Sequence, residues 1–192
     1  DRRLLIMAAE YDHATHTVTK PTLVMDKTPV NDPHDNACIS LDSDGFIWVF
    51  VSGRGTIRPG VTYRSAEPYS TDGFFRVSST AGENYTYPQV WHDPAKGFIH
   101  MLTRYNGGQR ELFFRTSPDG INWSAVTPFA QIQGHYQVSA RNGNVVGTFF
   151  NRHPGGNVDE RTDLYYMQTA DFGQTWTNAA GTVLTLPLKT AA

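Results

Sequence analysis

Residues 169–176 read Thr-Ala-Asp-Phe-Gly-Gln-Thr-Trp, and this segment decides the fold because it has the pattern Ser/Thr-x-Asp-x-Gly-x-x-Trp. Residues 117–123 have the same pattern with one residue deleted. Ser65 lies 52 residues before Ser117, and Thr169 lies 52 residues after it. A period near 50 residues in a strand-rich sequence is typical of a β-propeller, in which each repeat forms one four-stranded sheet, or blade. We therefore predict an all-β fold of four-stranded antiparallel blades.

The composition limits the class of protein. The chain has 192 residues, of which 39% are hydrophobic, so it can bury a substantial core. No apolar run approaches the length that crosses a membrane. A net charge of −2 and a pI near 6.4 give no general attraction to nucleic acid, so any recognition of an anion must be local. Cys38 is the single cysteine, which excludes an intramolecular disulfide.

Apolar runs and turn residues divide the chain into blades. We expect residues 1–192 to form one partial propeller, with a partial blade at 1–30 and blades at 31–80, 81–130 and 131–180. Closed propellers have roughly 4–8 blades, so these three and a half blades are expected to be a fragment of a longer protein. The segment Phe46–Val51 is apolar at every position, as expected for a strand covered on both faces by neighbouring blades.

The repeated motif is expected to be structural. Its Asp and Ser/Thr side chains can bond backbone amides in a turn, its Gly permits a positive φ, and its Trp can pack under the neighbouring strand. In an antiparallel blade, the start of the first strand and the end of the second strand lie on one side of the sheet. The motif follows the third strand, so it lies on the opposite side.

The first side collects residues that could do chemistry. Arg54, Arg104 and Arg152 lie at equivalent strand ends, 50 and 48 residues apart. Three like charges at one mouth repel one another unless an anion lies between them, and the planar fork of Arg matches a carboxylate. The same side also carries His34, Tyr87, His135, Tyr136 and His153. These residues together predict a pocket for an acidic sugar.

Each of these residues also has a structural alternative. A single Arg can be a solvated surface charge, and His34 can simply cap the turn of residues 32–36. Tyr87 can pack at the rim of the sheet, with Tyr85 taking its role. His135 and Tyr136 can line the channel without touching substrate. The remaining histidines lack the spacing of metal ligands, so no metal or cofactor is predicted; they are His13, His16, His92 and His100.

The repeated motif resembles the Asp-boxes of sialidases and other BNR-repeat proteins. A more specific resemblance rests on the segments His34–Ala37, Leu41–Phe50, Ser52–Gly55, Thr86–Pro88, Arg104–Tyr105 and Leu164–Tyr166. They are similar to the BNR-4 type of repeat, which includes propeller polysaccharide lyases such as those acting on ulvan. The resemblance spans most of the chain.

This resemblance implies that His34 abstracts a proton, that Tyr87 transfers a proton and that Arg104 neutralises a uronate. In those lyases a second His usually follows the Ser-Gly pair, whereas this sequence has Arg54 there. The resemblance also implies an acidic polysaccharide or oligosaccharide as partner and an extracellular or periplasmic location. Substrate binding is expected from the other residues on this side, namely Arg54, His135, Tyr136, Arg152 and His153.

Three functions are open on the sequence alone. A polysaccharide lyase would cleave a uronic-acid-containing polymer by β-elimination. A glycoside hydrolase needs a pair of carboxylic acids or, in sialidases, a Tyr activated by Glu. The acids on the arginine side form no repeat-matched pair; they are Asp32, Asp35, Glu83, Asp159 and Glu160. A non-catalytic propeller would bind the same carbohydrate without turning it over.

Overall fold

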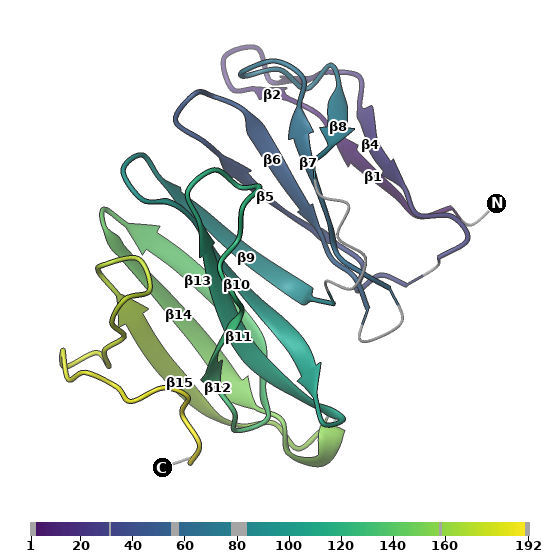
Figure 1. Cartoon of the computed structure of the whole chain (residues 1–192). Helices are drawn as coiled ribbons and strands as arrows, with labels where there is room; N and C mark the ends of the chain where they lie inside the picture. Colours follow the sequence, from purple (N-terminus) through teal and green to yellow (C-terminus); the bar gives the residue numbers. More distant parts are fainter. Residues whose placement is uncertain (1–2, 31, 55–57, 78–83, 158, 191–192) are drawn as a thin grey trace.

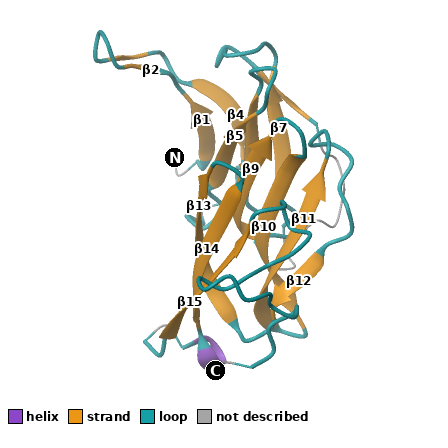
Figure 2. Ribbon diagram, turned by 90° about the vertical axis from the view of Figure 1, so that its left-hand side faces the viewer, coloured by secondary structure: helices purple, strands orange, loops and turns teal. Residues whose placement is uncertain are grey.

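The computed structural model describes residues 3–30, 32–54, 58–77, 84–157 and 159–190, and these residues are mainly antiparallel β-strands. Near the N-terminus, β1 (Leu5–Ala8) pairs with β4 (Thr22–Asp26). Between them β2 (Tyr11–Asp12) and β3 (Thr17–Val18) form a separate hairpin that projects from one end of the molecule (Figure 2). The partial blade predicted at 1–30 is thus a two-stranded sheet with a separate hairpin between its two strands.

Two complete four-stranded sheets follow, each in sequential strand order. The first contains β5 (Ala37–Leu41), β6 (Ile47–Val51), β7 (Val61–Ser65) and β8 (Phe74–Arg76). The second contains β9 (Thr86–Asp93), β10 (Gly97–Asn106), β11 (Gln109–Ser117) and β12 (Thr127–Ala130).

The last sheet has three strands, β13 (Gly134–Asn142), β14 (Val145–Arg152) and β15 (Thr162–Thr169). A short 3₁₀ helix, η1 (Pro154–Gly156), follows β14. Four strands were predicted for this blade, but in the described residues the pairing after Asp171 is limited to isolated bridges from Thr177 to Gln168 and Val183. Asx bonds at Asp171 and Asn178 on either side of this bridge hold the chain in turns.

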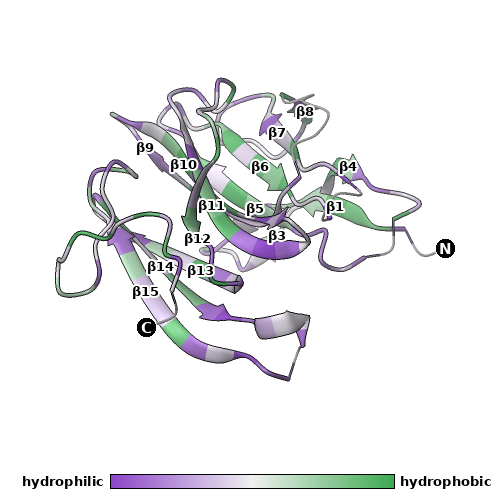
Figure 3. Cartoon of the chain, turned by 60° about the horizontal axis from the view of Figure 1, so that its bottom comes forward, coloured by the Kyte–Doolittle hydropathy of each residue, from purple (hydrophilic) through white to green (hydrophobic). Residues whose placement is uncertain are grey.

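The sheets lie side by side, and their first strands β5, β9 and β13 contact one another in series (Figure 1). Apolar side chains fill the spaces between sheets. Trp48 and Phe50 of β6 pack with Phe98 of β10, and Ile99 and Met101 on the other face of β10 pack toward the last sheet. All five residues of β6 are buried, and Figure 3 shows this strand as largely hydrophobic. The chain is thus an all-β propeller of antiparallel blades, as predicted.

The Asp-box turns are structural, because their polar groups bond within the turn. Ser117 Oγ accepts from the N–H of Gly120 at 2.8 Å, and Thr169 Oγ1 accepts from Gly173 at 2.8 Å. Gly120 has φ +75°, and a Cβ there would meet the Trp48 ring at 2.7 Å. None of the described residues forms a helix with the length and apolarity needed to span a bilayer.

Candidate functional site

A cavity of about 560 Å³ opens on the side opposite the Asp-boxes, where loops of three sheets meet. The sheet of β5–β8 contributes the segment before β5 and the end of β6. The next sheet contributes the β10–β11 hairpin, and the last contributes the start of β13 and the loop after β14. The lining residues are His34, Arg54, Tyr105, Gly108, Gln109, Arg110, Gln133, Tyr136, His153, Gly155 and Gly156.

Tyr87 joins the two sides of this site. Its ring centroid lies 6.3 Å from that of His34, in an edge-on arrangement, and 5.3 Å from that of Tyr136. Tyr87 and Tyr136 lie where the pairing of β9 with β10 and of β13 with β14 shifts register. Both residues have left-handed backbones, with φ of 52° and 48°. Each bulge thus redirects a tyrosine at the same end of its blade.

The two tyrosines have pKa values shifted in opposite directions. Burial raises the pKa of Tyr87, and its hydrogen bond with Tyr136 raises it further. Burial also raises the pKa of Tyr136, but hydrogen bonds from Arg161 and Tyr87 and the charges of Arg161 and Arg110 outweigh that effect and lower it. The Arg161 guanidinium also lies 3.9 Å from the centroid of the Tyr136 ring. Tyr136 is therefore the more acidic member of the pair.

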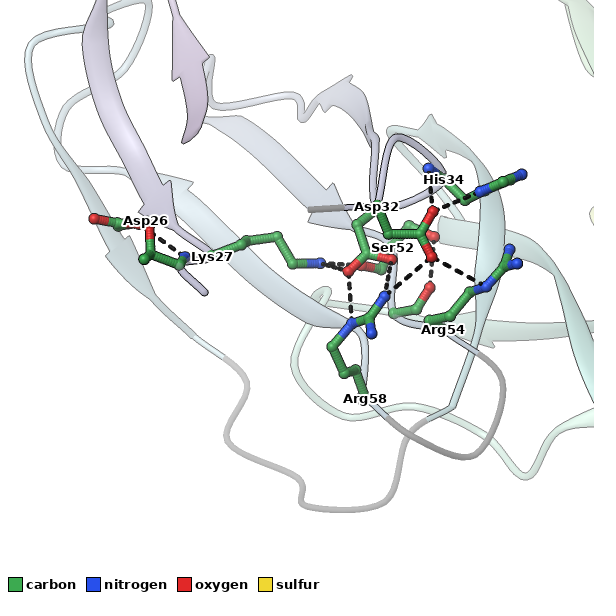
Figure 4. Close-up of polar contacts among 10 residues, drawn as sticks. Asp26, Lys27, Asp32, His34, Ser52, Arg54 and Arg58 are labelled. Atoms are coloured by element: carbon green, nitrogen blue, oxygen red, sulfur yellow. Dashed lines mark hydrogen bonds and ion pairs between the residues drawn. The ribbon is translucent and has the colours of Figure 1, made fainter. Parts of the chain in front are cut away.

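Asp32 lies behind His34 and Arg54 (Figure 4). Its Oδ1 accepts hydrogen bonds from His34 Nδ1 at 2.5 Å and from the His34 backbone N–H at 3.0 Å. Its Oδ2 pairs with Arg54 Nε at 3.2 Å and with Arg58 Nη2 at 3.3 Å. Burial raises the pKa of Asp32, but the bonds from His34 and the charge of Arg54 bring it down to about 2. The carboxylate is ionised at neutral pH.

A buried ion network anchors this group. Asp35, whose side chain is fully buried, accepts from Arg58 Nε at 2.8 Å and pairs with Lys27 Nζ at 2.8 Å. Lys27 also donates to the Ser52 carbonyl at 2.6 Å. The cations Lys27, Arg54 and Arg58 face the carboxylates of Asp32 and Asp35, so three positive charges meet two negative ones. This excess of one positive charge favours an anionic ligand in the cavity next to it.

The structure brings together some of the predicted residues. His34, Arg54, Tyr136 and His153 line the cavity, and Tyr87 contacts two of them. The backbone of His135 belongs to β13, but its side chain lies outside the described part of the structure. Glu83 also lies outside the described residues.

Of the three arginines expected to converge, Arg54 lines this cavity, and Arg104 and Arg152 are not among its lining residues. Side chains alternate between the two faces of a strand. Tyr105 therefore takes the cavity side of β10, and the Arg104 guanidinium lies 5.8 Å from the centroid of the Phe113 ring. Arg152 is close enough to Tyr165 for its charge to lower the pKa of that phenol, although burial raises that pKa overall.

Sequence reasoning missed Asp32 as a partner of His34, and it missed Arg110 and Arg161. Arg110 could have been found, because the third strand starts on the same side as the second strand ends. Arg161 lies in the loop between β14 and β15, and no periodic signal marks it. Among the described residues, no group of three or more His, Cys, Asp or Glu side chains is arranged to hold a metal ion.

The pattern of the BNR repeat-containing family matches residues 1–192, the full length of the sequence. None of the curated proteins matches it. Among solved structures, a polysaccharide lyase PL25 ulvan lyase aligns with a TM-score of 0.76 and 19% identity, covering 95% of this chain and 50% of that chain. Its complex with -[GlcA(1-4)Rha3S]- aligns with a TM-score of 0.77 and 18% identity, at the same coverage.

A second relative in structure is the polysaccharide lyase Uly1, with a TM-score of 0.70 and 14% identity, covering 100% of this chain and 53% of that chain. The chain therefore spans about half the length of these lyases. Identities this low establish a shared propeller fold and leave the chemistry to be argued from the cavity.

Proposed function

The chain belongs to the BNR repeat-containing family, and from this premise we propose that its cavity binds a uronic-acid-containing polysaccharide and cleaves it by β-elimination. The supporting observation is the character of the lining. Among the described residues, the cavity is lined by Arg, His, Tyr, Gln and Gly, and no carboxylate is among them. The solved structures that share the fold include polysaccharide lyases, and one of them is bound to a saccharide that contains GlcA.

The lining favours elimination over hydrolysis for a chemical reason. A glycoside hydrolase places two carboxyl groups on either side of the scissile bond. Here the carboxylate of Asp32, which contacts the lining residues His34 and Arg54, is engaged on both oxygens by His34, Arg54 and Arg58. It therefore has no free oxygen to act as a nucleophile or to hold a water. Elimination needs no such pair.

In the proposed reaction, a base removes the proton from C5 of the uronic acid, and the electron pair forms the C4–C5 double bond. The C4–O bond breaks, and an acid protonates the leaving oxygen. Negative charge develops on the uronate carboxyl group as C5 loses its proton, so fixed positive charge next to that group lowers the barrier. Arg54 and Arg110 line the cavity and can supply this charge.

His34 is the proposed base. Asp32 is ionised and can only accept, so His34 Nδ1 carries the proton of their bond, and the neutral form of the ring has its lone pair on Nε2. Tyr136 is the proposed acid, because it lines the cavity and has a lowered pKa. A hydroxyl that gives up its proton more easily is the better donor to a leaving oxygen. Tyr87 hydrogen-bonds to Tyr136 and supports it.

The BNR-4 resemblance implies that Arg104 neutralises the uronate, and this role stays a prediction. The contribution of Arg104 is to be compared with those of Arg54 and Arg110. His153 and the β10–β11 hairpin would contact neighbouring sugar units, since they line the cavity. His135 and Arg152 stay predicted substrate contacts. A polymer substrate of this kind also fits the proposed extracellular or periplasmic location.

The test is an assay on uronic-acid-containing polysaccharides that follows the ultraviolet absorbance of the unsaturated product. We expect the wild type to be active, and His34→Ala and Arg54→Ala to lose at least about 100-fold in kcat/KM. The controls are His13→Ala in the projecting hairpin and Arg3→Ala, whose partner is the exposed Asp26, and both should keep full activity. New reducing ends without absorbance would identify a hydrolase instead. Saccharide binding with neither signal would identify a binding protein.

A further inference from the structure

The two oxygens of Asp32 serve two different groups of the proposed reaction. Oδ1 bonds the ring and backbone of His34, at 2.5 Å and 3.0 Å. Oδ2 forms an ion pair with Nε of Arg54 at 3.2 Å. Figure 4 shows the carboxylate lying between the imidazole and the guanidinium, with one oxygen turned toward each. A single side chain thus controls the orientation of both.

Both partners keep their reactive ends free of Asp32. With Nδ1 bonded to Asp32, His34 has Nε2 as its remaining nitrogen, and the residue lines the cavity. Arg54 contacts Asp32 through Nε, so neither terminal nitrogen of its guanidinium group is used for this contact. Nη1 of Arg54 is buried and has no hydrogen-bond partner among the described residues. A carboxylate that binds the end of this fork would satisfy it.

Asp32 is itself held from behind. Arg58 donates from Nη2 to Asp32 Oδ2 at 3.3 Å and to Asp35 Oδ1 at 3.0 Å, so it bridges the two acids. Asp35 is locked by Lys27, whose side chain is only 4% exposed. The backbone N–H of Asp35 also bonds the carbonyl of Asp32 at 3.1 Å. These bonds leave the carboxylate little freedom to turn.

We propose that Asp32 is a positioning residue that sets the tautomer of the base His34 and, at the same time, aims Arg54 at the carboxylate of the substrate. The proposal rests on the function proposed above and adds a residue that contacts no substrate. It gives a reason for a carboxylate next to a cavity for an anion, because this carboxylate orients both groups that act on the substrate. Asn at this position has one acceptor oxygen where Asp has two, so it can serve His34 or Arg54 but not both.

The first measurement needs neither the Asp32→Asn variant nor an activity assay. Long-range ¹H–¹⁵N NMR spectra of the wild-type protein, with His34 assigned from the loss of its signals in His34→Gln, report which ring nitrogen carries the proton. We expect the proton on Nδ1 at a pH where the ring is neutral. A proton on Nε2 would overturn the proposal. This result holds whether or not Asp32→Asn folds.

The second measurement uses Asp32→Asn. Its matched control is Asp12→Asn, because Asp12 also accepts through Oδ1 from the N–H two residues ahead, at 2.7 Å, but lies on the projecting hairpin. We expect Asp32→Asn to shift His34 toward the Nε2–H tautomer and to lower kcat by about 10²- to 10⁴-fold, as loss of an orienting carboxylate does for other catalytic histidines. Asp12→Asn should change neither.

The outcomes separate this proposal from the function on which it rests. An active wild type whose Asp32→Asn variant keeps both its kcat and its His34 tautomer would overturn the role of Asp32 and leave the lyase function standing. A wild type with no lyase activity on any uronic-acid polymer would refute the function. In that case the tautomer shift still decides whether Asp32 positions His34.

Discussion

The rings of Tyr87 and Tyr136 lie 5.3 Å apart at an interplanar angle of 59°, although the residues come from different blades. They are 49 residues apart, and each has a left-handed backbone at a register shift in the first strand of its blade. Such a backbone is unfavourable for a bulky side chain and persists when the surroundings hold it. The two matched bulges therefore place a pair of phenols at the cavity.

Replacing Tyr87 by Phe should raise the pKa of Tyr136. Burial raises that pKa, and the hydrogen bonds from Arg161 and Tyr87 lower it below the ordinary value, so losing Tyr87 removes part of the lowering. Phenolate absorbance during an alkaline titration measures the change. Tyr136→Phe should abolish the earliest transition, and the exposed Tyr69→Phe serves as the control. An earliest transition that survives in Tyr136→Phe would show that another tyrosine is the acidic one.

Removing the Asp-box carboxylate should affect stability and not turnover. Asp119 accepts from the N–H groups of Ile121 and Asn122 at 2.8 Å and 2.7 Å. We expect Asp119→Asn to lower the free energy of unfolding by about 1–2 kcal/mol at neutral pH. Urea unfolding measures the loss, and unchanged kcat and KM would support a structural role. A fall in kcat in a fully folded variant would count against it.

The same residue predicts a pH dependence. Burial raises the pKa of Asp119, but the backbone and side chain of Asn122, the Ile121 N–H and Ser117 bring it from 3.8 down to about 2. Because the folded pKa lies below the unfolded one, the stabilisation is complete above about pH 4 and is lost as the pH falls toward 2. The stability difference between wild type and Asp119→Asn should therefore shrink over this range.

Breaking the buried network should be costly. Asp35→Ala leaves Lys27 and Arg58 without their shared carboxylate, and removal of one partner from a buried pair costs about 3–5 kcal/mol. The double variant Lys27→Met/Asp35→Leu should recover part of this loss, because it removes the two most deeply buried charges of this network. Urea unfolding of the single and double variants measures the coupling. Additive effects would contradict the predicted coupling.

The glycines at the cavity should keep it wide, because they have no side chains to occupy it. Gly108 and Gly156 have φ of +86° and +73°, and a Cβ at either would meet no atom within 4 Å. Gly143 in the β13–β14 turn, at the far end of the blade, has φ +58° and equally open surroundings. Substitution by Ala should cost about 1–2 kcal/mol at each position for the left-handed backbone.

Only the variants at the cavity should then weaken the apparent binding of the substrate, measured as KM. Gly108→Ala and Gly156→Ala are expected to raise KM several-fold, because the added methyl groups occupy space at the cavity wall. Gly143→Ala should leave KM unchanged at a similar loss of stability. Equal KM values in all three variants would mean that the substrate does not approach these loops.

Much of the fold could be predicted from particular residues. The repeated motif at 117–123 and 169–176 gave the blade period, and the apolar segment ending at Val51 is the fully buried β6. The fourth strand predicted for the last blade is reduced to bridges at Thr177, because the turns around Asp171 and Asn178 bend the chain. Propensity over three residues cannot outweigh such side-chain bonds to the backbone.

The candidate site was less predictable. Strand-end positions identified His34, Arg54, Tyr136 and His153 as cavity residues, since hairpin direction alone decides the side of the sheet. They could not separate Arg104 from Tyr105, because a shift of one residue turns a side chain to the other face of the strand. They placed Asp32 on this side among acids with no repeat-matched pair, but they gave no sign that it contacts His34 and Arg54.

The sequence by itself therefore determined the blade period, the side of the sheets that carries the Asp-boxes, and the loops that meet on the opposite side. These properties depend on local spacing and on antiparallel geometry. Only the tertiary structure decided which side chains face the cavity and which partners hold them. That choice depends on bulges at Tyr87 and Tyr136 and on contacts between residues far apart in sequence, such as Lys27 with Ser52, which no local pattern records.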